Sequence, residues 1–325
     1  MGPVRDVCVI GLGLIGGSVL RAAVAAGRTA WGASESTVDA EAAAADGYDA
    51  GSDVAAALRR AAANDALVVL AVPLTAVDAV LRLVAEHAPG CLLTDVTSVK
   101  GPVRDAVRRS APDARFAGGH PMAGTAESGW KAGTPELFSG AAWVVCVEDD
   151  TDLSAWREAA MLALDSGAHV VPLRADAHDE TVARISHLPH LLAAVLATVG
   201  AQGGPLAAAL AAGSFSDGTR VAGSRPELVR AMTEGNRAAL LPVLDEALGL
   251  LGAARGSLAS TGGLAATVNA GHDALRSLTE HRAAPRASVT LDLGAPDARE
   301  GLLALGERGG RLTALDGETL TGEVA

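Results

Sequence analysis

The chain has 325 residues and a formal net charge of −12; 49% of its residues are hydrophobic, but only 2% are aromatic. A surface with this much negative charge repels nucleic acid and anionic membranes, so neither is expected as a partner. The length predicts a cofactor-sized domain followed by a smaller one. Cys8, Cys91 and Cys146 lie in apolar runs without CxxC or CxxH spacing, which indicates core thiols rather than disulfides or a metal site.

The beginning of the chain passes directly from Met1 into a strand-like apolar run, without the charged and then apolar pattern of a signal peptide. No uninterrupted apolar stretch of about 20 residues occurs, so a membrane-spanning helix is not expected. We therefore predict a cytoplasmic protein.

In the first half of the sequence, short β-branched runs alternate with longer segments rich in Ala, Leu and Arg. This alternation is typical of a parallel sheet with crossover helices. The expected strands are residues 6–10, 29–32, 66–72, 91–95, 115–118, 142–148 and 169–173. We predict an α/β fold for residues 1–174, with a Rossmann-like, doubly wound, mostly parallel sheet that binds a dinucleotide.

From residue 175 to residue 284 the sequence is helical, with long apolar runs at 191–201 and 226–251. Helices that are apolar over much of their surface need a partner. We expect an all-helical substrate and dimerisation domain that forms a homodimer, with a monomeric helical core as the alternative. Residues 285–325 form a short C-terminal extension, expected as a strand, a helix and a hairpin appended to the helical domain.

A glycine pattern, "VCVIGLGLIGGS", follows the first expected strand. Gly11, Gly13 and Gly16 stand where a dinucleotide turn needs glycine for a tight turn, for approach to the pyrophosphate and for helix packing. The positive end of the next helix then faces the phosphates. The residues predicted to bind the cofactor are Gly11, Leu12, Gly13, Leu14, Ile15, Gly16, Ser34, Glu35, Val72, Pro73 and Thr97.

The end of the second expected strand bears on the choice between NAD and NADP. An acidic residue usually accepts the ribose hydroxyls there, but this chain has Ser34, followed by Glu35. Residues 34–39 contain no arginine for a 2′-phosphate, and Glu35 would repel one. NAD is therefore expected. NADP stays open, because serines are nearby and Arg28 or Arg59 could reach the phosphate.

Polar residues follow two of the expected strands, at the sheet edge where doubly wound folds bind ligands. The segment "LLTDVTSVKG" places Ser98 after the fourth strand, and "RFAGGHPMAGT" places His120 in the loop after the fifth. We expect both side chains beside the nicotinamide. Glycines around the histidine let a substrate approach the backbone closely.

Several other polar residues are less informative. Lys100 is expected to orient the cofactor amide or Asp95, or to cap the next helix, and these alternatives stay open. His178 and Asp179, in "DAHDE", are interpreted as capping residues at a helix start, without a chemical role. Trp130 is interpreted as a packing residue.

These segments, together with "SHLPH" and "LAAGSFSDGTRVA", resemble the prephenate and arogenate dehydrogenase family, most of all its actinobacterial branch. The resemblance runs from Val7 to Leu278 and does not cover the tail after Pro285. It implies oxidation of a ring carbinol coupled to loss of the ring carboxylate. The product is 4-hydroxyphenylpyruvate from prephenate or tyrosine from arogenate, and the pathway is tyrosine biosynthesis.

The resemblance assigns His120 as the base that removes the hydroxyl proton, a role that suits a neutral imidazole. Ser98 would hydrogen-bond the same hydroxyl or hold the base in position. Because the substrate is a dianion, Arg220 is the expected cation, since a guanidinium can grip a carboxylate through two hydrogen bonds. A local ion pair with Asp217 is the alternative.

His190 and Ser186 lie four residues apart near a helix start, so they share one face of the helix. We expect them to meet the substrate across an interdomain cleft, whereas His187 points elsewhere. Gly124 and Thr125, in the segment after the catalytic histidine, complete the expected substrate-binding residues. No metal ligand cluster is present in the sequence.

Two segments depart from the family pattern. Many relatives carry an acidic residue directly after the "HPxAGT" segment, whereas this chain has Ala126 and then Glu127. Val229 and Ala231 stand at the Trp and Asp positions that follow the arginine segment. An acidic neighbour would favour the ammonium group of arogenate. We predict prephenate as the substrate, with arogenate as the alternative.

Two other classes of protein share parts of this pattern. A β-hydroxyacid dehydrogenase would use a lysine of the helical domain, but no lysine follows residue 131. A non-catalytic NAD-binding module would keep the glycines without needing Ser98, His120 and Arg220 together. The sequence therefore predicts an NAD-dependent oxidoreductase. It leaves tyrosine feedback open, and residues 285–325 are fewer than a full regulatory ACT domain needs.

Overall fold

The computed structural model describes residues 5–125 and 127–325. The chain divides into two compact units. The first unit comprises Met1–His178 and Ser288–Val324, and the second comprises Asp179–Ala287.

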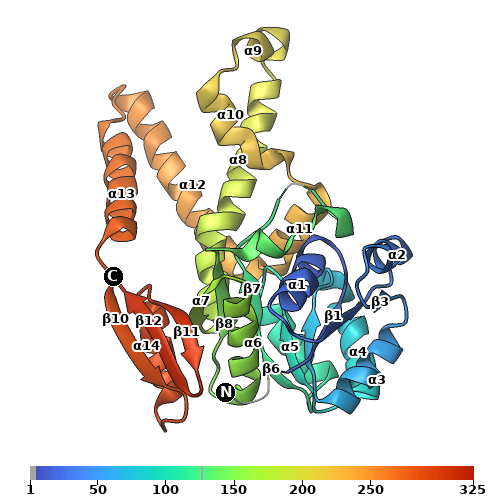
Figure 1. Cartoon of the computed structure of the whole chain (residues 1–325). Coiled ribbons are helices and arrows are strands. Elements are labelled where there is room, and N and C mark those ends of the chain that lie inside the picture. The colour runs from blue at the N-terminus through green and yellow to red at the C-terminus, as the bar shows by residue number, and fades with distance from the viewer. Residues whose placement is uncertain (1–4, 126) are drawn as a thin grey trace. The chain divides into compact units, whose positions relative to one another are not determined.

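A six-stranded parallel sheet forms the centre of the first unit, in the order β3-β2-β1-β4-β5-β6 (Figure 1). Its strands are β1 (Val7–Ile10), β2 (Ala30–Ala33), β3 (Ala50–Gly51), β4 (Leu67–Leu70), β5 (Leu92–Asp95) and β6 (Arg115–Ala117). The intervening helices are α1 (Leu14–Ala25), α2 (Thr37–Ala45), α3 (Val54–Asn64), α4 (Val77–His87) and α5 (Gly101–Ser110). The strand order reverses at β1, so the predicted Rossmann-like, doubly wound fold is confirmed.

Both faces of this sheet are buried, because successive strand residues alternate between two cores. On β1, Val7 and Val9 pack in one core, and Cys8 and Ile10 pack in the other. Helices α3, α4 and α5 contribute to the second core, whereas α1 and α6 (Leu153–Asp165) contribute to the first. Small aliphatic side chains fill most of both cores, as the low aromatic content requires.

A second six-stranded sheet has the order β10-β12-β11-β9-β8-β7. Its elements are β7 (Gly119–Pro121), β8 (Ala142–Cys146), β9 (His169–Leu173), β10 (Ala287–Asp292), α14 (Ala298–Glu307), β11 (Arg311–Asp316) and β12 (Thr319–Val324). β8 and β9 run parallel, whereas β7 is antiparallel to β8, and β11 is antiparallel to β9. Short 3-10 turns lie at Leu74–Ala76, Trp130–Ala132 and Pro135–Phe138.

The chain passes from the first sheet to the second at Gly118, whose carbonyl accepts a hydrogen bond from the Cys146 N–H at 2.7 Å. The expectation of one sheet, with His120 in a loop, was wrong in this respect: residues 119–121 form β7. The bend depends on close backbone contact, since a Cβ on Gly119 would lie 2.6 Å from the Asp95 carbonyl oxygen. Strands 142–146 and 169–173 accordingly belong to the second sheet.

The C-terminal extension also differs from expectation. It is not appended to the helical unit, because β11 pairs with β9 through Leu312 and Val170. Its apolar side chains share the core of the first unit, namely Leu293, Leu302, Leu305, Leu312, Leu320 and Val324. A Cβ on Gly306 of α14 would collide with the Pro172 carbonyl, so this helix lies directly against β9. The extension therefore enlarges the second sheet.

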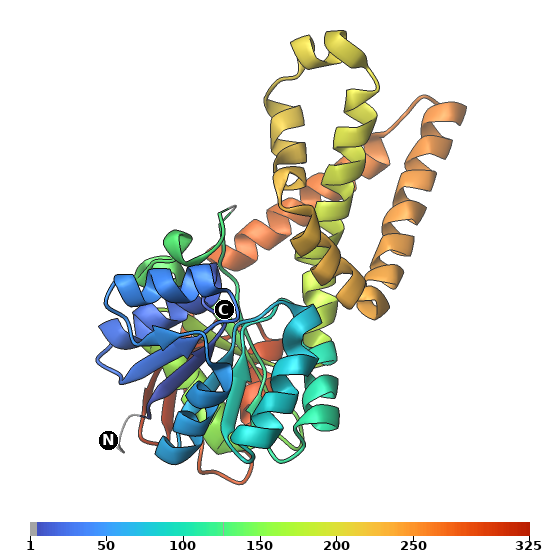
Figure 2. The ribbon, with the colours of Figure 1, turned by 90° about the vertical axis from the view of Figure 1, so that its right-hand side faces the viewer.

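The second unit is all-helical, as predicted (Figures 1 and 2). Its elements are the end of α7 (Ala175–Val182), a π turn (Ala183–His187), α8 (Leu188–Ala201), α9 (Gly204–Leu210), α10 (Gly213–Thr219), a 3-10 turn (Arg220–Gly223), α11 (Pro226–Gly235), α12 (Arg237–Ser260) and α13 (Ala265–Ala283). Ala183, Leu240 and Val243 form its buried cluster. The Phe215 ring packs so closely on α8 that a Cβ on Gly200 would collide with it.

Much of the apolar surface of the helical unit is exposed. On α8, Val195 and Val199 are each 60% exposed, and Leu192 and Leu196 lie on the same face at about 40%. By length and composition alone, the helical stretch over residues 175–201 would be able to cross a bilayer. An apolar face of this kind requires a cover of protein or lipid.

The cysteines provide a test of core packing. Burial raises the pKa of the Cys8 thiol to about 12 and that of Cys91 to about 11, and Cys146 is buried too. Because the thiolate is the reactive form, only roughly 10⁻⁴ of Cys8 and 10⁻³ of Cys91 would be reactive at about pH 8. We expect the native protein to resist maleimide under conditions in which guanidinium-unfolded protein is fully labelled. Rapid labelling of Cys8 or Cys91 in the native protein would contradict this packing.

Candidate active site

The turn between β1 and α1 depends on two glycines for its shape. Gly11 has a φ of +99°, and a Cβ there would collide with the carbonyl of Ala71. A Cβ on Gly16 would collide with the carbonyl of Gly11, so the helix packs directly on the turn. These two glycines therefore set the direction in which α1 leaves the sheet.

Gly13 is different, because a Cβ there would meet no other described atom within 4 Å. It is the N-cap residue of α1, which, among the described residues, has no side-chain cap and no acidic residue in its first turn. The main-chain N–H groups and the positive end of the helix are thus available to an anion, which is what a dinucleotide pyrophosphate requires. Leu14 and Ile15 begin the helix half-buried, whereas Leu12 is fully buried, so only its main chain can contact a ligand.

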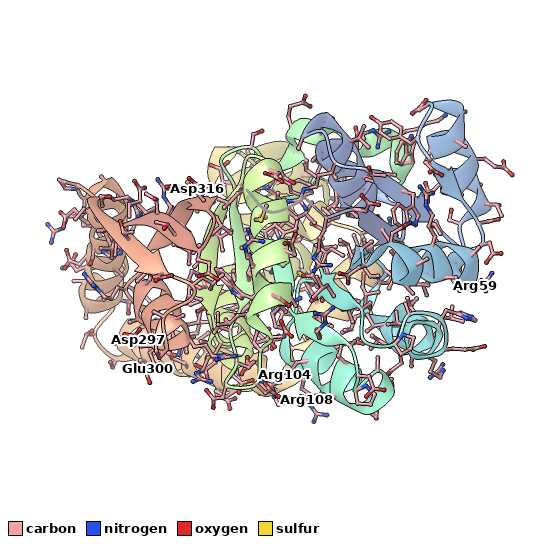
Figure 3. All side chains as sticks on the ribbon, turned by 60° about the horizontal axis from the view of Figure 1, so that its bottom comes forward. Arg59, Arg104, Arg108, Asp297, Glu300 and Asp316 are labelled. Atoms are coloured by element: carbon pink, nitrogen blue, oxygen red, sulfur yellow. The ribbon has the colours of Figure 1, made fainter. Side chains whose placement is uncertain are left out.

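The residues after β2 and β4 border this turn. Ser34 is buried, and Glu35 is exposed. Of the two cations considered for a 2′-phosphate, Arg28 is buried and ion-paired with Asp165, so it does not serve; Arg59 is exposed on α3 (Figure 3). The site thus offers a 2′-phosphate less positive charge than the sequence suggested.

Val72 and Pro73 follow β4 directly, and Val72 lies against the glycine turn. Thr97 follows β5 but is buried, and its hydroxyl contacts the Asp95 carboxylate. The Thr97 side chain therefore belongs to a buried cluster rather than to a surface facing a ligand.

This cluster is built around the buried ion pair of Lys100 and Asp95, whose side chains are 1% and 0% exposed. The Lys100 ammonium also donates to Thr97 Oγ1 at 3.2 Å and to the Gly119 carbonyl. The Asp95 carboxylate accepts the Thr97 N–H at 2.9 Å and the Gly119 N–H at 3.1 Å. Three acceptors satisfy the ammonium, and both carboxylate oxygens have donors. The ion pair therefore fixes both main-chain polar groups of Gly119.

Of the three roles considered for Lys100, the structure supports the contact with Asp95. Lys100 is the N-cap residue of α5, but its side chain makes no cap hydrogen bond. Ser98 lies in the same turn and is half-buried. Since this turn is bonded to Gly119, it is joined to the strand that carries His120.

His120 lies in β7 opposite Val144 of β8 and is half-buried. Its Nδ1 lies 2.8 Å from Nε2 of His178 in α7. The two rings meet edge to face, with centroids 5.0 Å apart and an interplanar angle of 78°. His178 is only 1% exposed. Its interpretation as a capping residue without a chemical role missed this contact. The sequence signal that could have identified His178 is its place shortly after β9, because polar residues that follow other strands are predicted to form the active site.

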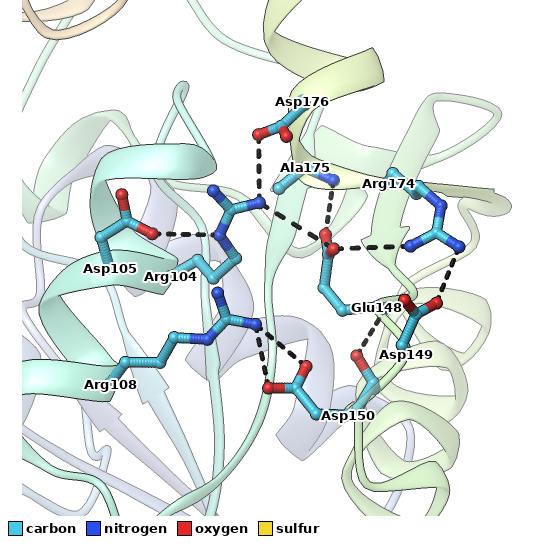
Figure 4. A network of polar contacts seen from close by, with 10 residues as sticks. Arg104, Asp105, Arg108, Glu148, Asp149, Asp150, Arg174, Ala175 and Asp176 are labelled. Carbon is cyan, nitrogen blue, oxygen red and sulfur yellow. Dashed lines mark hydrogen bonds and ion pairs between the residues drawn. The ribbon is translucent and has the colours of Figure 1, made fainter.

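A polar network on the surface positions the beginning of α7 (Figure 4). Arg104 donates to the Asp176 carboxylate at 3.0 Å, and Glu148 accepts the Ala175 N–H at 2.8 Å. Partial burial lowers the pKa of the Arg104 guanidinium, but neighbouring carboxylates outweigh this effect and raise the pKa above its usual value. Arg104 and Arg108 lie near one another on α5 (Figure 3). The network fixes the first turn of α7, which carries His178.

In the helical unit, the segment that leads to Arg220 is helix α10, which is followed by a 3-10 turn that begins at Arg220. Within this helix, Thr219 Oγ1 donates to the Phe215 carbonyl at 2.7 Å. Arg220 is exposed. Within the described ranges it forms no ion pair with Asp217, which was the alternative to substrate binding.

His190 and Ser186 contact each other, with His190 Nδ1 2.8 Å from the Ser186 carbonyl oxygen. A carbonyl only accepts, so Nδ1 carries the hydrogen, and the neutral ring has Nε2 as an acceptor. His187 is buried, and the Asn236 amide lies 3.1 Å from its Nδ1. The two histidines of "SHLPH" therefore have different surroundings.

The segment after β7 includes Gly124 and Thr125, both exposed, and the Thr125 hydroxyl accepts the Glu127 N–H at 3.2 Å. Glu127 is exposed, and Ala126 lies outside the described residues. Val229 and Ala231, at the other departure from the family pattern, lie half-buried on α11.

Trp130 anchors the far end of this segment. Its main-chain N–H donates to Asp39 at 2.8 Å, and its indole N–H donates to Asp46 at 2.7 Å. The Arg21 guanidinium stacks on its ring at 3.4 Å from the centroid. The segment that begins at the candidate base is thus tied to α1 and α2.

Comparison with family models gives two adjacent matches. Residues 19–172 match the model described as "Prephenate dehydrogenase, nucleotide-binding domain", and residues 174–260 match "Prephenate dehydrogenase, dimerization domain". The chain is 32% identical to a cyclohexadienyl dehydrogenase from Zymomonas mobilis over 271 residues, which cover 80% of this chain and 90% of that protein. It is 36% identical to a prephenate dehydrogenase from Bacillus subtilis over 159 residues, 48% of this chain and 43% of the relative.

Solved structures agree with these matches. A Corynebacterium glutamicum protein, described provisionally as a prephenate dehydrogenase, has a TM-score of 0.89 and 45% identity, covering 94% of this chain and 98% of its own. A Synechocystis arogenate dehydrogenase has a TM-score of 0.72 and 27% identity, covering 84% and 99%. An Aquifex aeolicus prephenate dehydrogenase, solved with hydroxyphenyl propionate and NAD+, has a TM-score of 0.77 at 22% identity, covers 85% and 99%, and supports the fold.

The buried ion pair predicts a large effect of single substitutions. Lys100→Met leaves the Asp95 carboxylate buried without its cation, and we expect a loss of about 3–5 kcal/mol in the free energy of unfolding, measured by urea titration. Arg109→Met, which removes the exposed pair with Asp78, is the matched control and should leave the free energy of unfolding nearly unchanged. Equal losses for both variants would contradict the burial of an unpaired Asp95 carboxylate in Lys100→Met.

Proposed function

The chain belongs to the prephenate dehydrogenase family, and we propose that it oxidises prephenate with NAD, releasing carbon dioxide and 4-hydroxyphenylpyruvate for tyrosine biosynthesis. It is an NAD-dependent oxidoreductase: the nucleotide-binding family model matches residues 19–172, and the glycine turn fits a dinucleotide. The observation that carries the proposal is the position of His120, on a strand that a buried ion pair fixes at Gly119. Such a residue supplies the base that this oxidation needs.

The proposed reaction needs one base and one hydride acceptor. The proton of the 4-hydroxyl group moves to His120 as the substrate carbon that bears this hydroxyl loses hydride. NAD, when bound, would supply the hydride acceptor. The ring carbonyl formed in this way draws in the electron pair of the carboxylate bond as carbon dioxide leaves and the ring becomes aromatic. His120 then returns its proton to the phenolate oxygen. No proton is consumed overall, so one neutral imidazole suffices.

The other residues bind and orient the substrate. Ser98 holds the hydroxyl or the base, from a turn joined to the same strand. Arg220, exposed and not paired with Asp217, supplies a cation for a substrate carboxylate. His190 contributes Nε2, because its Nδ1 is bonded to the Ser186 carbonyl. Gly124 and Thr125 complete the substrate-binding set.

Arogenate is the second candidate substrate. It is favoured by the 27% identical Synechocystis arogenate dehydrogenase and by the acidic Glu127 near the segment that follows the base. We favour prephenate, since both matched family models carry that name and the Glu127 side chain is exposed to solvent. A carboxylate that faces water contributes little to holding an ammonium group.

The helical unit forms a homodimer in this proposal. Its exposed apolar residues fall largely within residues 174–260, which match a dimerisation domain. A second copy therefore accounts for the apolar stretch over residues 175–201 without a membrane. We propose a cytoplasmic location, and the charge of −12 makes nucleic acid an unsuitable partner.

Steady-state assays of the purified protein test this function. We expect NADH formation with prephenate, at a higher kcat/KM than with arogenate or with NADP. His120→Asn should lower kcat by at least about 100-fold while leaving the Kd for NAD unchanged, because only the base is removed. A preference for arogenate would reassign the substrate. Full turnover by His120→Asn would exclude His120 as the base.

A further inference from the structure

The contact between His120 and His178 joins one ring nitrogen of each residue. At 2.8 Å, the separation of His120 Nδ1 and His178 Nε2 is that of a hydrogen bond, so one nitrogen carries the hydrogen and the other accepts it. These alternatives correspond to different tautomers of His120. Only one of them is compatible with a base that acts on a substrate hydroxyl.

We propose that His178 is a positioning residue that fixes the tautomer of the catalytic base. In this arrangement His120 Nδ1–H donates to Nε2 of His178, and Nε2 of His120 carries the lone pair that accepts the substrate proton. The opposite assignment would place the hydrogen on Nε2 of His120 and remove its basicity toward the substrate. The inference rests on the proposed function, in which His120 is the base.

Both partners lie on backbone that is fixed independently. The strand of His120 is held by Lys100 and Asp95 through Gly119. The helix of His178 is held at its first turn by Arg104 and Glu148 (Figure 4), and the His178 N–H donates to the Arg174 carbonyl at 2.9 Å. His178 is 1% exposed, so its ring has little freedom to turn away. The hydrogen bond is therefore preorganised.

A neutral partner suits this substrate. When His120 takes up the proton, its Nδ1–H becomes part of a cation, and the hydrogen bond to His178 becomes charge-assisted and stronger. The contact thus favours the charged state formed during reaction over the resting state. A carboxylate in this position would do the same but would also repel a dianion. An imidazole provides the acceptor without adding negative charge.

Three variants separate this role from packing. His178→Leu removes the acceptor, and we expect kcat with prephenate to fall roughly 10- to 100-fold while the Kd for NAD stays constant. His178→Gln retains an acceptor and should recover part of that loss. His187→Gln is the matched control, because His187 is also 1% exposed and hydrogen-bonded but lies in the helical unit. Equal kcat values for the Leu variant and the wild type would overturn the proposal, as would equal losses in the Leu and Gln variants.

Nitrogen-15 NMR of the imidazoles tests the tautomer without turnover. The proposal requires a protonated Nδ1 and an unprotonated Nε2 in His120 of the resting protein, and a downfield Nδ1–H resonance that disappears in His178→Leu. The opposite tautomer would overturn it. If prephenate is not oxidised but this tautomer is observed, the proposed function fails while the assignment of the hydrogen bond stands.

Discussion

The buried ion pair between Lys100 and Asp95 is the interaction on which the candidate active site depends. Buried charges cost free energy unless every polar atom finds a partner, and here the partners include both main-chain polar groups of Gly119. The pair therefore specifies a position more than it adds stability. Gly119 directly precedes His120, the candidate base, so a buried ion pair determines the backbone position from which the His120 side chain projects.

Small residues make this arrangement sterically feasible. A side chain at Gly119 would approach the Asp95 carbonyl at 2.6 Å, and Gly118 marks the point at which the chain leaves the parallel sheet for the second one. Gly11 and Gly16 play the corresponding part at the cofactor turn, where backbone packs on backbone. These glycines thus have steric reasons of different kinds: Gly11, Gly16 and Gly119 are required by close backbone packing, whereas the space beside Gly13 is open.

The parts of the fold that the sequence predicted are those encoded locally. Alternating apolar runs located the central strands to within a few residues, and the strand-glycine-helix order located the cofactor turn. The second sheet was missed because β7 has three residues, and its pairing with β8 has no local signature. The attachment of the C-terminal extension was missed for the same reason, since Leu312 pairs with Val170 far away in sequence. Patterns of period two predict a strand but not its neighbour.

In the candidate site, too, the locally encoded residues were predicted and the contacts between distant segments were not. The candidate base and the glycines stand out by residue type and by position at strand ends, whereas His178 lies 58 residues from His120 and becomes significant only through the fold. The histidine pair, the buried ion pair and the network around Arg104 together form one support for a single imidazole.

The most direct test of this account is a crystal structure of the protein with NAD and hydroxyphenyl propionate, in which the phenolic oxygen stands for the reacting hydroxyl. That oxygen is expected to lie within about 2.6–3.2 Å of His120 Nε2, with Nδ1 still bonded to His178. A phenolic oxygen bound to another side chain, with His120 turned away from the ligand, would contradict it.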